Sequence, residues 1–288
     1  MLVITHLWSV LPWLLTLGGV LCLLVALKRP SHQRLWLEDY ACLPHYQRHG
    51  QHISLHNVRA NRYGAPGTPY ASVYTTQHYD LSSLQRLWFA VESFSDYEAV
   101  AHTFFSFEWQ DGRCLVLSIE ARRQQGQVYS LWLGMLRHFE MIYSFGLESD
   151  FIVRRSLYQQ HQLYLYPLKM DQAAVQALLR NLLEDSQDLL QRPLFYHTLY
   201  RSCTSEAIRH LQAVLPAHQA RVLRWHPGHY IPGYADRMLR RAGLLPNDVP
   251  LETMRARYSV YERCQIAKQY EADDILFSQT LRRDVAPS

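Results

Sequence analysis

Cys203 is the residue whose setting most directly suggests covalent chemistry. The stretch FYHTLYRSCTSEAIR, residues 195–209, places it among small hydroxyl residues, directly ahead of a helical pattern. Backbone N–H groups at a helix start lack partners within the helix, and with the helix dipole they favour a thiolate. The thiolate is the reactive form of cysteine, and the same N–H groups can hold an oxyanion. The residues alone leave two interpretations open: a nucleophile, or a small buried apolar residue, the commoner role of an isolated cysteine.

A cysteine nucleophile needs a base, and His102 is the candidate. It opens the strand pattern AHTFFSFEW on a predicted hairpin with an Asp-Gly turn; an ordinary core or edge histidine is the alternative. The returning strand offers Ser118, Glu120 and Arg122 as groups that could orient the histidine. If the loop is 111–113, residue 102 pairs with 122, and His102, Glu120 and Arg122 share a face of the sheet. A two-residue loop would put Glu120 on the opposite face, so the pattern leaves the register open.

Other charged groups and the cysteine spacing narrow the functional class. Glu148 and Asp150 lie near Arg154 and Arg155, and we interpret this cluster as structural ion pairs rather than an acid/base pair. The 29 basic and 25 acidic side chains are scattered, so we expect no nucleic-acid partner. The five cysteines include no CxxC pair, which argues against structural zinc, and we expect no metal and no cofactor.

The N-terminal segment is strongly apolar. Residues 7–27 contain no Asp, Glu, Lys or Arg and are long enough for a helix that crosses a bilayer, so we predict a transmembrane anchor after a short leader, 1–6. A tether, 28–46, follows. Lys28, Arg29 and Arg34 come after the anchor, a charge bias that by itself would place the rest of the chain in the cytoplasm.

The remaining patterns predict an α+β fold, an antiparallel sheet with helices packed around it. Strand-like runs alternate with turns up to residue 168, including predicted hairpins over 101–123 and 150–168. Asp171 caps an amphipathic helical pattern over 171–190, and a second helix is predicted over 204–215. We therefore predict one domain over 47–250 and a C-terminal helical tail over 251–288.

Several segments together resemble the Lnb N-terminal periplasmic domain family of bacteria. The resemblance spans roughly residues 30–245, and the resembling segments occur in the order found in the family. It implies a circularly permuted papain-like fold, related to NlpC-type hydrolases and acyltransferases, in which the histidine strand precedes the cysteine helix. The segments are RPSHQRLW, ISLHNVRANRY, AHTFFSFEWQDGRCLVLSIEARRQQGQVYS, FEMIYSFGLESDFIVRR, LYLYPL, FYHTLYRSCTS and PGYADRMLRRAGLL.

The resemblance also implies a function and its residues. The family's named member is a lipoprotein N-acyltransferase, which implies Cys203 as the nucleophile, His102 as the base and Glu120 as the third group. Ser202 stands where the family usually has asparagine, which bears on the substrate class. The family faces the periplasm, and we follow it over the charge bias, expecting a single-pass protein of the bacterial inner membrane.

These inferences converge on a membrane-anchored, cysteine-dependent acyl-transfer enzyme that works through a thioester. A membrane lipid is the expected acyl donor, and a lipoprotein or peptide amine is the expected acceptor. Two alternatives stay open: a cell-wall peptidase or amidase with the same Cys–His pair, and a non-catalytic envelope scaffold.

Overall fold

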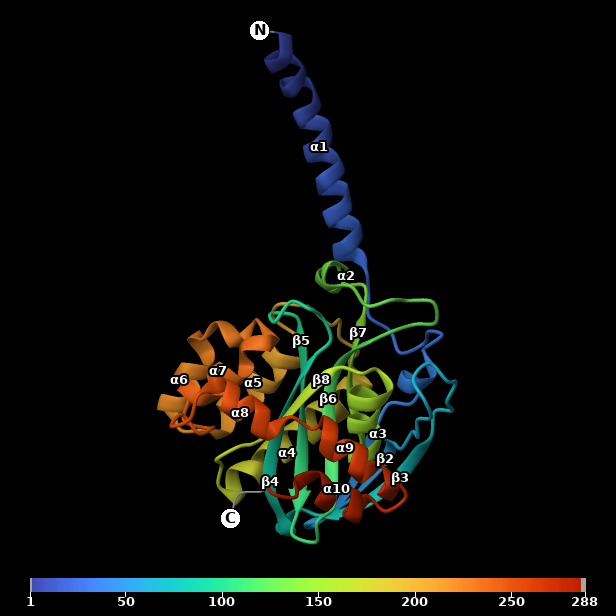
Figure 1. Cartoon of the computed structure of the whole chain (residues 1–288). Helices are drawn as coiled ribbons and strands as arrows, with labels where there is room; N and C mark the ends of the chain where they lie inside the picture. Colours follow the sequence, from blue (N-terminus) through green and yellow to red (C-terminus); the bar gives the residue numbers. More distant parts are fainter. Residues whose placement is uncertain (1, 286–288) are drawn as a thin grey trace.

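A mixed eight-stranded sheet forms the centre of the computed structural model, which describes residues 2–285, with side chains at residue 13 and from residue 15 onward (Figure 1). The strand order is β1-β2-β7-β6-β5-β4-β8, and β3 also pairs with β2. Neighbouring strands run antiparallel except at one parallel bridge, Arg59 to Gly146. The predicted α+β class is confirmed. The strands are β1 (His45–His49), β2 (His52–Arg59), β3 (Tyr74–Asp80), β4 (Leu84–Ser93), β5 (Ala101–Trp109), β6 (Cys114–Arg122), β7 (Glu140–Leu147) and β8 (Gln162–Pro167).

Helices cover both faces of the sheet. On β5, the Phe104 ring packs at a tilt against Phe151 of α3, whereas the neighbouring Thr103 points the other way and contacts Thr204 of α5. In Figure 1, α3, α9 and α10 lie in front of the strands, and α5 to α7 gather at one side. The helices are α1 (Leu2–Leu27), α2 (Leu131–Met135), α3 (Glu148–Val153), α4 (Gln172–Gln191), α5 (Cys203–Val214), α6 (Ala217–Trp225), α7 (Ala235–Arg241), α8 (Leu251–Tyr258), α9 (Tyr261–Ala267) and α10 (Asp274–Arg282).

The hairpin of β5 and β6 forms as predicted, but in a different register. Its loop is 110–112, because Gly112 takes a left-handed φ of 88° as the last loop residue and Trp109 then pairs with Arg113. Phe105 therefore lies opposite Leu117, and the same register brings residue 102 opposite 120 rather than 122. Because the shift is two residues, the expected faces are kept.

The predicted hairpin over 150–168 is wrong in its first half. Residues 148–153 form α3, and a π-helical turn, Arg154–Tyr158, continues it before β8 begins at Gln162. All six residues of α3 are buried. A short apolar run such as FIV fits a buried strand and a buried helix equally well, so its periodicity cannot distinguish between the two.

The C-terminal segment packs against the sheet through α10. Arg282 forms a buried ion pair with Glu148 of α3, and its guanidinium lies over the Trp88 ring at 4.7 Å. The backbone of Val260 also donates to Leu163 in β8 at 3.0 Å. The predicted division of the chain at residue 251 stays a prediction, while the helical character predicted for this segment agrees with α8, α9 and α10.

The first helix, α1, extends away from the body of the protein (Figure 1). Its helical course agrees with the expectation for 7–27 and includes most of the predicted leader, of which Met1 lies outside the described residues. Within the described part of the chain, no helix combines the length and the apolar character needed to cross a membrane. The predicted transmembrane character of 7–27 is therefore not supported.

Candidate active site

Cys203 is the first residue of α5, one residue earlier than the helix start expected from the sequence. Ser202 caps this helix: its hydroxyl accepts from the Ser205 backbone N–H at 3.3 Å, and the Ser205 hydroxyl accepts from the Ser202 N–H at 2.8 Å. This reciprocal pair satisfies two N–H groups at the helix start. The serine that replaces the family's asparagine therefore performs a capping role, and the cysteine is held rigidly at the helix terminus.

His102 interacts with the Cys203 thiol and with the polar side chains of β6. The imidazole lies close enough to the thiol for each group to shift the pKa of the other, and its Nε2 lies 2.7 Å from the Ser118 hydroxyl and 3.9 Å from Glu120 Oε1. The structure therefore brings together all three residues proposed from the sequence. Of the other two candidates on the returning strand, Ser118 is the direct hydrogen-bond partner of Nε2, whereas Arg122 donates to the backbone carbonyls of Tyr40 and Ala41.

The ionisation of both groups favours a thiolate–imidazolium pair. Burial raises the pKa of the Cys203 thiol, but the charge and hydrogen bond of His102 outweigh it and lower the pKa to about 7. Burial lowers the pKa of His102, yet the thiolate and Glu120 raise it above its ordinary value. The charge of each group stabilises the charged form of the other, as in enzymes with a cysteine nucleophile and a histidine base.

Two other buried cysteines provide an internal comparison. Burial raises the pKa of Cys264 to about 12 and that of Cys114 well above its ordinary value. Both are buried as Cys203 is, but neither gains a histidine partner. The depressed pKa of Cys203 is thus a consequence of its neighbours and not of its depth.

Glu120 is held mainly by groups other than His102. Its Oε1 accepts from Arg155 at 2.8 Å, and its Oε2 accepts from the Tyr40 hydroxyl at 2.8 Å. Burial raises its pKa, but the charges of Arg155 and His102 lower it far below the usual range. Glu120 therefore presents a permanent negative charge near the imidazole, while Ser118 makes the short contact.

Arg155 lies between two carboxylates on β4 and β6, the strands that flank β5. Besides Glu120, it donates from Nε to Glu92 at 2.7 Å, and the other Glu92 oxygen lies 2.6 Å from Nδ1 of His161. Burial raises the pKa of Glu92, but Arg155 and His161 lower it to about 2. Glu92 pairs with His102 across β4 and β5, so three neighbouring strands supply the polar side chains around the imidazole.

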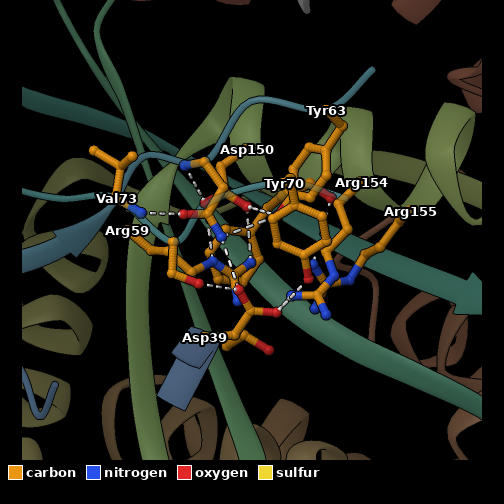
Figure 2. A network of polar contacts seen from close by, with 12 residues as sticks. Asp39, Arg59, Tyr63, Tyr70, Val73, Asp150, Arg154 and Arg155 are labelled. Carbon is orange, nitrogen blue, oxygen red and sulfur yellow. Dashed lines mark hydrogen bonds and ion pairs between the residues drawn. The ribbon is translucent and has the colours of Figure 1, made fainter. Parts of the chain in front are cut away.

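A second polar network fixes the helical turn that carries these arginines (Figure 2). Arg59 of β2 donates two hydrogen bonds of 2.9 Å to Asp150 in α3, and Asp39 accepts from Arg154 at 2.7 Å. Both pairs are buried or nearly so, and Tyr63 donates to Asp150 as well. The expected local cluster is therefore not what forms: the described ion pairs join these charged residues to partners far away in the sequence.

Tyr196 is a further site residue that sequence reasoning missed. Its hydroxyl is hydrogen-bonded to the Cys203 backbone and lies 3.4 Å from the Tyr129 hydroxyl. Burial raises its pKa well above 10, so the group stays protonated and can donate. Its proximity in sequence to Cys203, within the same FYHTLYRSCTS segment, was the available signal.

Cys203 and His102 line a cavity of about 390 Å³. Part of its lining is polar and charged, including Glu92, Glu120 and Arg155. The rest is largely apolar and aromatic, with residues from 94–101, 129–131, 196–199 and 230–232. A cavity of this size accommodates a small organic ligand or a segment of an acyl chain.

Among the described residues, one group has side chains placed so that they could hold a metal: Asp185, Glu206 and His210. The guanidinium of Arg209 already lies among them, 2.5 Å from Asp185, 2.7 Å from Glu206 and 3.0 Å from His210. A positive charge thus occupies the centre of this cluster. We interpret it as a structural network that joins α4 to α5.

Comparison with known proteins gives one match. The family model described as Lnb N-terminal periplasmic domain matches residues 70–235, which include His102, Ser118, Glu120 and Cys203. Searches of curated proteins and of solved structures returned no match. The family description assigns the matched region to a periplasmic domain, which indicates a location in the cell envelope. More than half of the chain is matched, and the protein belongs to the Lnb N-terminal periplasmic domain family.

Proposed function

We propose that this protein is a cysteine-dependent acyl-transfer enzyme of the bacterial envelope. The observation that carries the proposal is the pairing of Cys203, whose pKa is lowered to about 7, with His102 in a partly apolar cavity. Buried cysteines with no functional role have raised pKa values, as Cys114 and Cys264 do here. The histidine strand precedes the cysteine helix, the order of the circularly permuted papain-like fold that we propose for the chain.

The first half-reaction forms a thioester. The Cys203 thiolate attacks the carbonyl carbon of an ester, and the negative charge moves to the carbonyl oxygen. Collapse of this intermediate breaks the bond to the leaving alkoxide, which takes a proton from the His102 imidazolium. The products are an acyl-cysteine, a free alcohol and a neutral histidine.

The second half-reaction releases the acyl group. An amine attacks the thioester carbonyl, and neutral His102 accepts the proton that the amine loses. Collapse of the intermediate breaks the C–S bond and restores the thiolate–imidazolium pair. A lipoprotein or peptide amine is the acceptor we propose; water in its place would make the same site a hydrolase.

The oxyanion would be held at the start of α5. The Cys203 backbone N–H is near the attacked carbon by covalent geometry, and the Tyr196 hydroxyl lies beside the Cys203 backbone. Two donors converging on a developing charge are the usual arrangement for acyl transfer. Tyr196 would rotate its hydroxyl proton from its resting partner toward the oxyanion.

Ser118, Glu120 and Arg155 act through His102 in this proposal. In the imidazolium form Nε2–H donates to the Ser118 hydroxyl, which holds the ring in its orientation. The Glu120 carboxylate stabilises the imidazolium, and Arg155 keeps that carboxylate in place and ionised. They are therefore positioning residues.

A lipid is the acyl donor we propose, and α1 supports this choice. The described large apolar side chains of α1 are mostly exposed, among them Leu15, Leu23 and Leu27. Exposed apolar surface of this extent is stabilised by contact with lipid or protein. We propose that α1 holds the domain at the inner membrane, with the active site on the periplasmic side.

Adduct trapping tests the proposal. The purified full-length protein is incubated with lipid vesicles in the absence of any amine acceptor. The mass of the peptide that contains Cys203 is then measured. An increase equal to one acyl group, absent in Cys203→Ala, is expected. An acyl adduct that persists in Cys203→Ala, or no adduct at all in the wild type, contradicts the proposed nucleophile.

Product analysis separates acyl transfer from the two alternatives. Transfer predicts a consumed lipid ester and an acylated amine, whereas a cell-wall peptidase or amidase predicts cleaved muropeptides and unchanged lipid. A non-catalytic scaffold predicts neither product. It also predicts that Cys203 reacts with a thiol probe no faster than a free peptide thiol near pH 7.

A further inference from the structure

An exposed apolar surface surrounds the side of the cavity nearest α1. Six large apolar side chains make up this surface, which we call the rim: Val128, Leu131, Trp132, Leu136, Leu199 and Tyr200. Val128 is 78% exposed and Trp132 is 75% exposed, although both are among the residue types that proteins usually bury. Six such side chains gathered in two short segments are more than the isolated exposed apolar residues found on ordinary surfaces.

Hydrogen bonds join the two segments of the rim into one surface. The Thr198 hydroxyl donates to the Leu131 carbonyl at 2.7 Å, which ties the loop before Cys203 to α2. Gly134 permits this close approach, because a Cβ atom there would lie 2.3 Å from the Thr198 hydroxyl oxygen. The two segments of the rim are therefore held together by specific contacts within the fold.

The rim also adjoins the end of α1. Lys28 donates from Nζ to the Leu136 carbonyl at 3.2 Å, and Arg137 donates to the Ala26 carbonyl at 2.9 Å. Figure 1 shows α2 at the base of α1. The exposed apolar side chains of α1, including Leu27 at this junction, thus continue into the rim.

The rim leads directly to the nucleophile. Leu131 and Leu199 belong to the rim and also line the cavity that contains Cys203. Tyr129 and Thr198, their neighbours in the chain, line it too. An apolar group that lies on the rim is therefore next to the cavity mouth.

A lipid surface is the partner that fits this chemistry. The segments 128–137 and 199–201 contain no acidic residue, while Lys28 and Arg137 lie at the junction with α1. Tryptophan and tyrosine favour the membrane–water boundary, where their apolar rings and polar tips are both satisfied. Basic side chains at the same level attract anionic headgroups.

We propose that the rim rests on the bilayer, so that an acyl chain passes from the membrane past Leu131 and Leu199 into the cavity. The bilayer contact stands on the exposed residues themselves, while the passage of an acyl chain rests on the proposed acyl-transfer function.

Quenching by brominated lipids tests the contact without any catalysis. The full-length protein is placed in vesicles of phosphatidylglycerol and phosphatidylcholine, with or without bromine on the acyl chains. The difference between the wild type and Trp132→Phe isolates the fluorescence of Trp132, because the other tryptophans cancel. Trp225→Phe is the matched control, since Trp225 is 76% exposed and lies at the end of α6, away from α2 (Figure 1).

The expected result is a Trp132 component that brominated lipid quenches and a Trp225 component that it leaves unchanged. Equal quenching of the two, or none of Trp132, overturns the proposal. A second outcome also overturns it: the lipid-free protein is a dimer, and Trp132 in that dimer is already shielded from aqueous quenchers. A second copy of the chain would then cover the rim.

A kinetic comparison tests the delivery of acyl chains. The double variant Val128→Ser, Trp132→Ser alters rim residues that do not line the cavity, and we expect it to consume vesicle-borne ester about tenfold more slowly. Its rate on a short-chain soluble ester should equal that of the wild type, and Trp225→Ser should match the wild type on both. Equal losses on both esters would overturn the delivery role. If the wild type consumes neither ester, the proposed function fails, while the quenching result still decides the membrane contact.

Discussion

Replacing His102 with alanine should convert Cys203 into a thiol that is almost fully protonated at pH 7. In the wild type the pKa of Cys203 is lowered to about 7 from its ordinary value of 9.0, with His102 as the largest cause of the lowering. A difference of about two pKa units corresponds to about 2.7 kcal/mol of extra stabilisation of the thiolate. The cysteine is only 4% exposed, so this interaction is little screened by solvent.

The magnitude follows from the fraction ionised. At pH 7 about half of the wild-type population carries a thiolate, whereas an unperturbed cysteine carries about one in a hundred. Alkylation by a small reagent follows the thiolate, so His102→Ala should slow the reaction of Cys203 by about 50-fold at pH 7. Burial, the largest single contribution, then raises the pKa against only the hydrogen bonds of Thr103 and Thr204.

The assay is the rate of iodoacetamide modification from pH 5 to pH 10, followed by mass spectrometry of the peptide that contains Cys203. This readout separates Cys203 from Cys22, which is also free and is exposed. The wild-type rate should rise with a midpoint near pH 7, and the variant's midpoint should lie above pH 9. A wild-type midpoint near that of a free thiol, or a midpoint that His102→Ala leaves unchanged, would refute the proposed pair.

Three further predictions concern the residues around this pair. Ser118→Ala should lower kcat/KM by about fivefold to tenfold, the effect of one neutral hydrogen bond, and shift the pH profile; Ser118→Thr should restore both, and an unchanged profile would exclude a positioning role. Glu120→Gln should lower the free energy of unfolding at pH 7 by about 3 kcal/mol, measured by urea denaturation, since Arg155 loses a buried charged partner. Because the pKa of Glu120 is depressed in the fold, its contribution is present above its ordinary value of 4.5 and disappears as the pH falls below it; a loss that is the same at pH 3 as at pH 7 would contradict this. Ser202→Ala should cost about 1 kcal/mol of stability, whereas Ser202→Asn should retain the cap, and equal stability of all three forms would show that the cap contributes nothing.

Local patterns were sufficient for several parts of the fold. Asp171 caps α4, accepting from the Ala174 backbone at 2.7 Å, because the cap and the helical periodicity lie within a few residues of each other. The same holds for the start of α5 and for the hairpin that carries His102. The shared face of His102 and Glu120 was also within reach of sequence reasoning, since side-chain alternation survives a shift of two residues.

Other parts depended on contacts across the fold. The register of β5 and β6 rests on which residue of the turn takes the left-handed conformation, and the observed register brings Ser118 within hydrogen-bond reach of His102. The run at 148–153 forms a helix whose residues are all buried, and periodicity cannot distinguish such a helix from a buried strand.

The sequence by itself determined where the cysteine and histidine lie in their own elements, and which family the chain resembles. Only the tertiary structure decided how they are activated, because pKa values depend on neighbours in space. Arg155 reaches Glu92 and Glu120 over 63 and 35 residues of chain, and Tyr40 reaches Glu120 over 80. No local pattern encodes such pairings, since they form only when distant strands and helices close around one buried site.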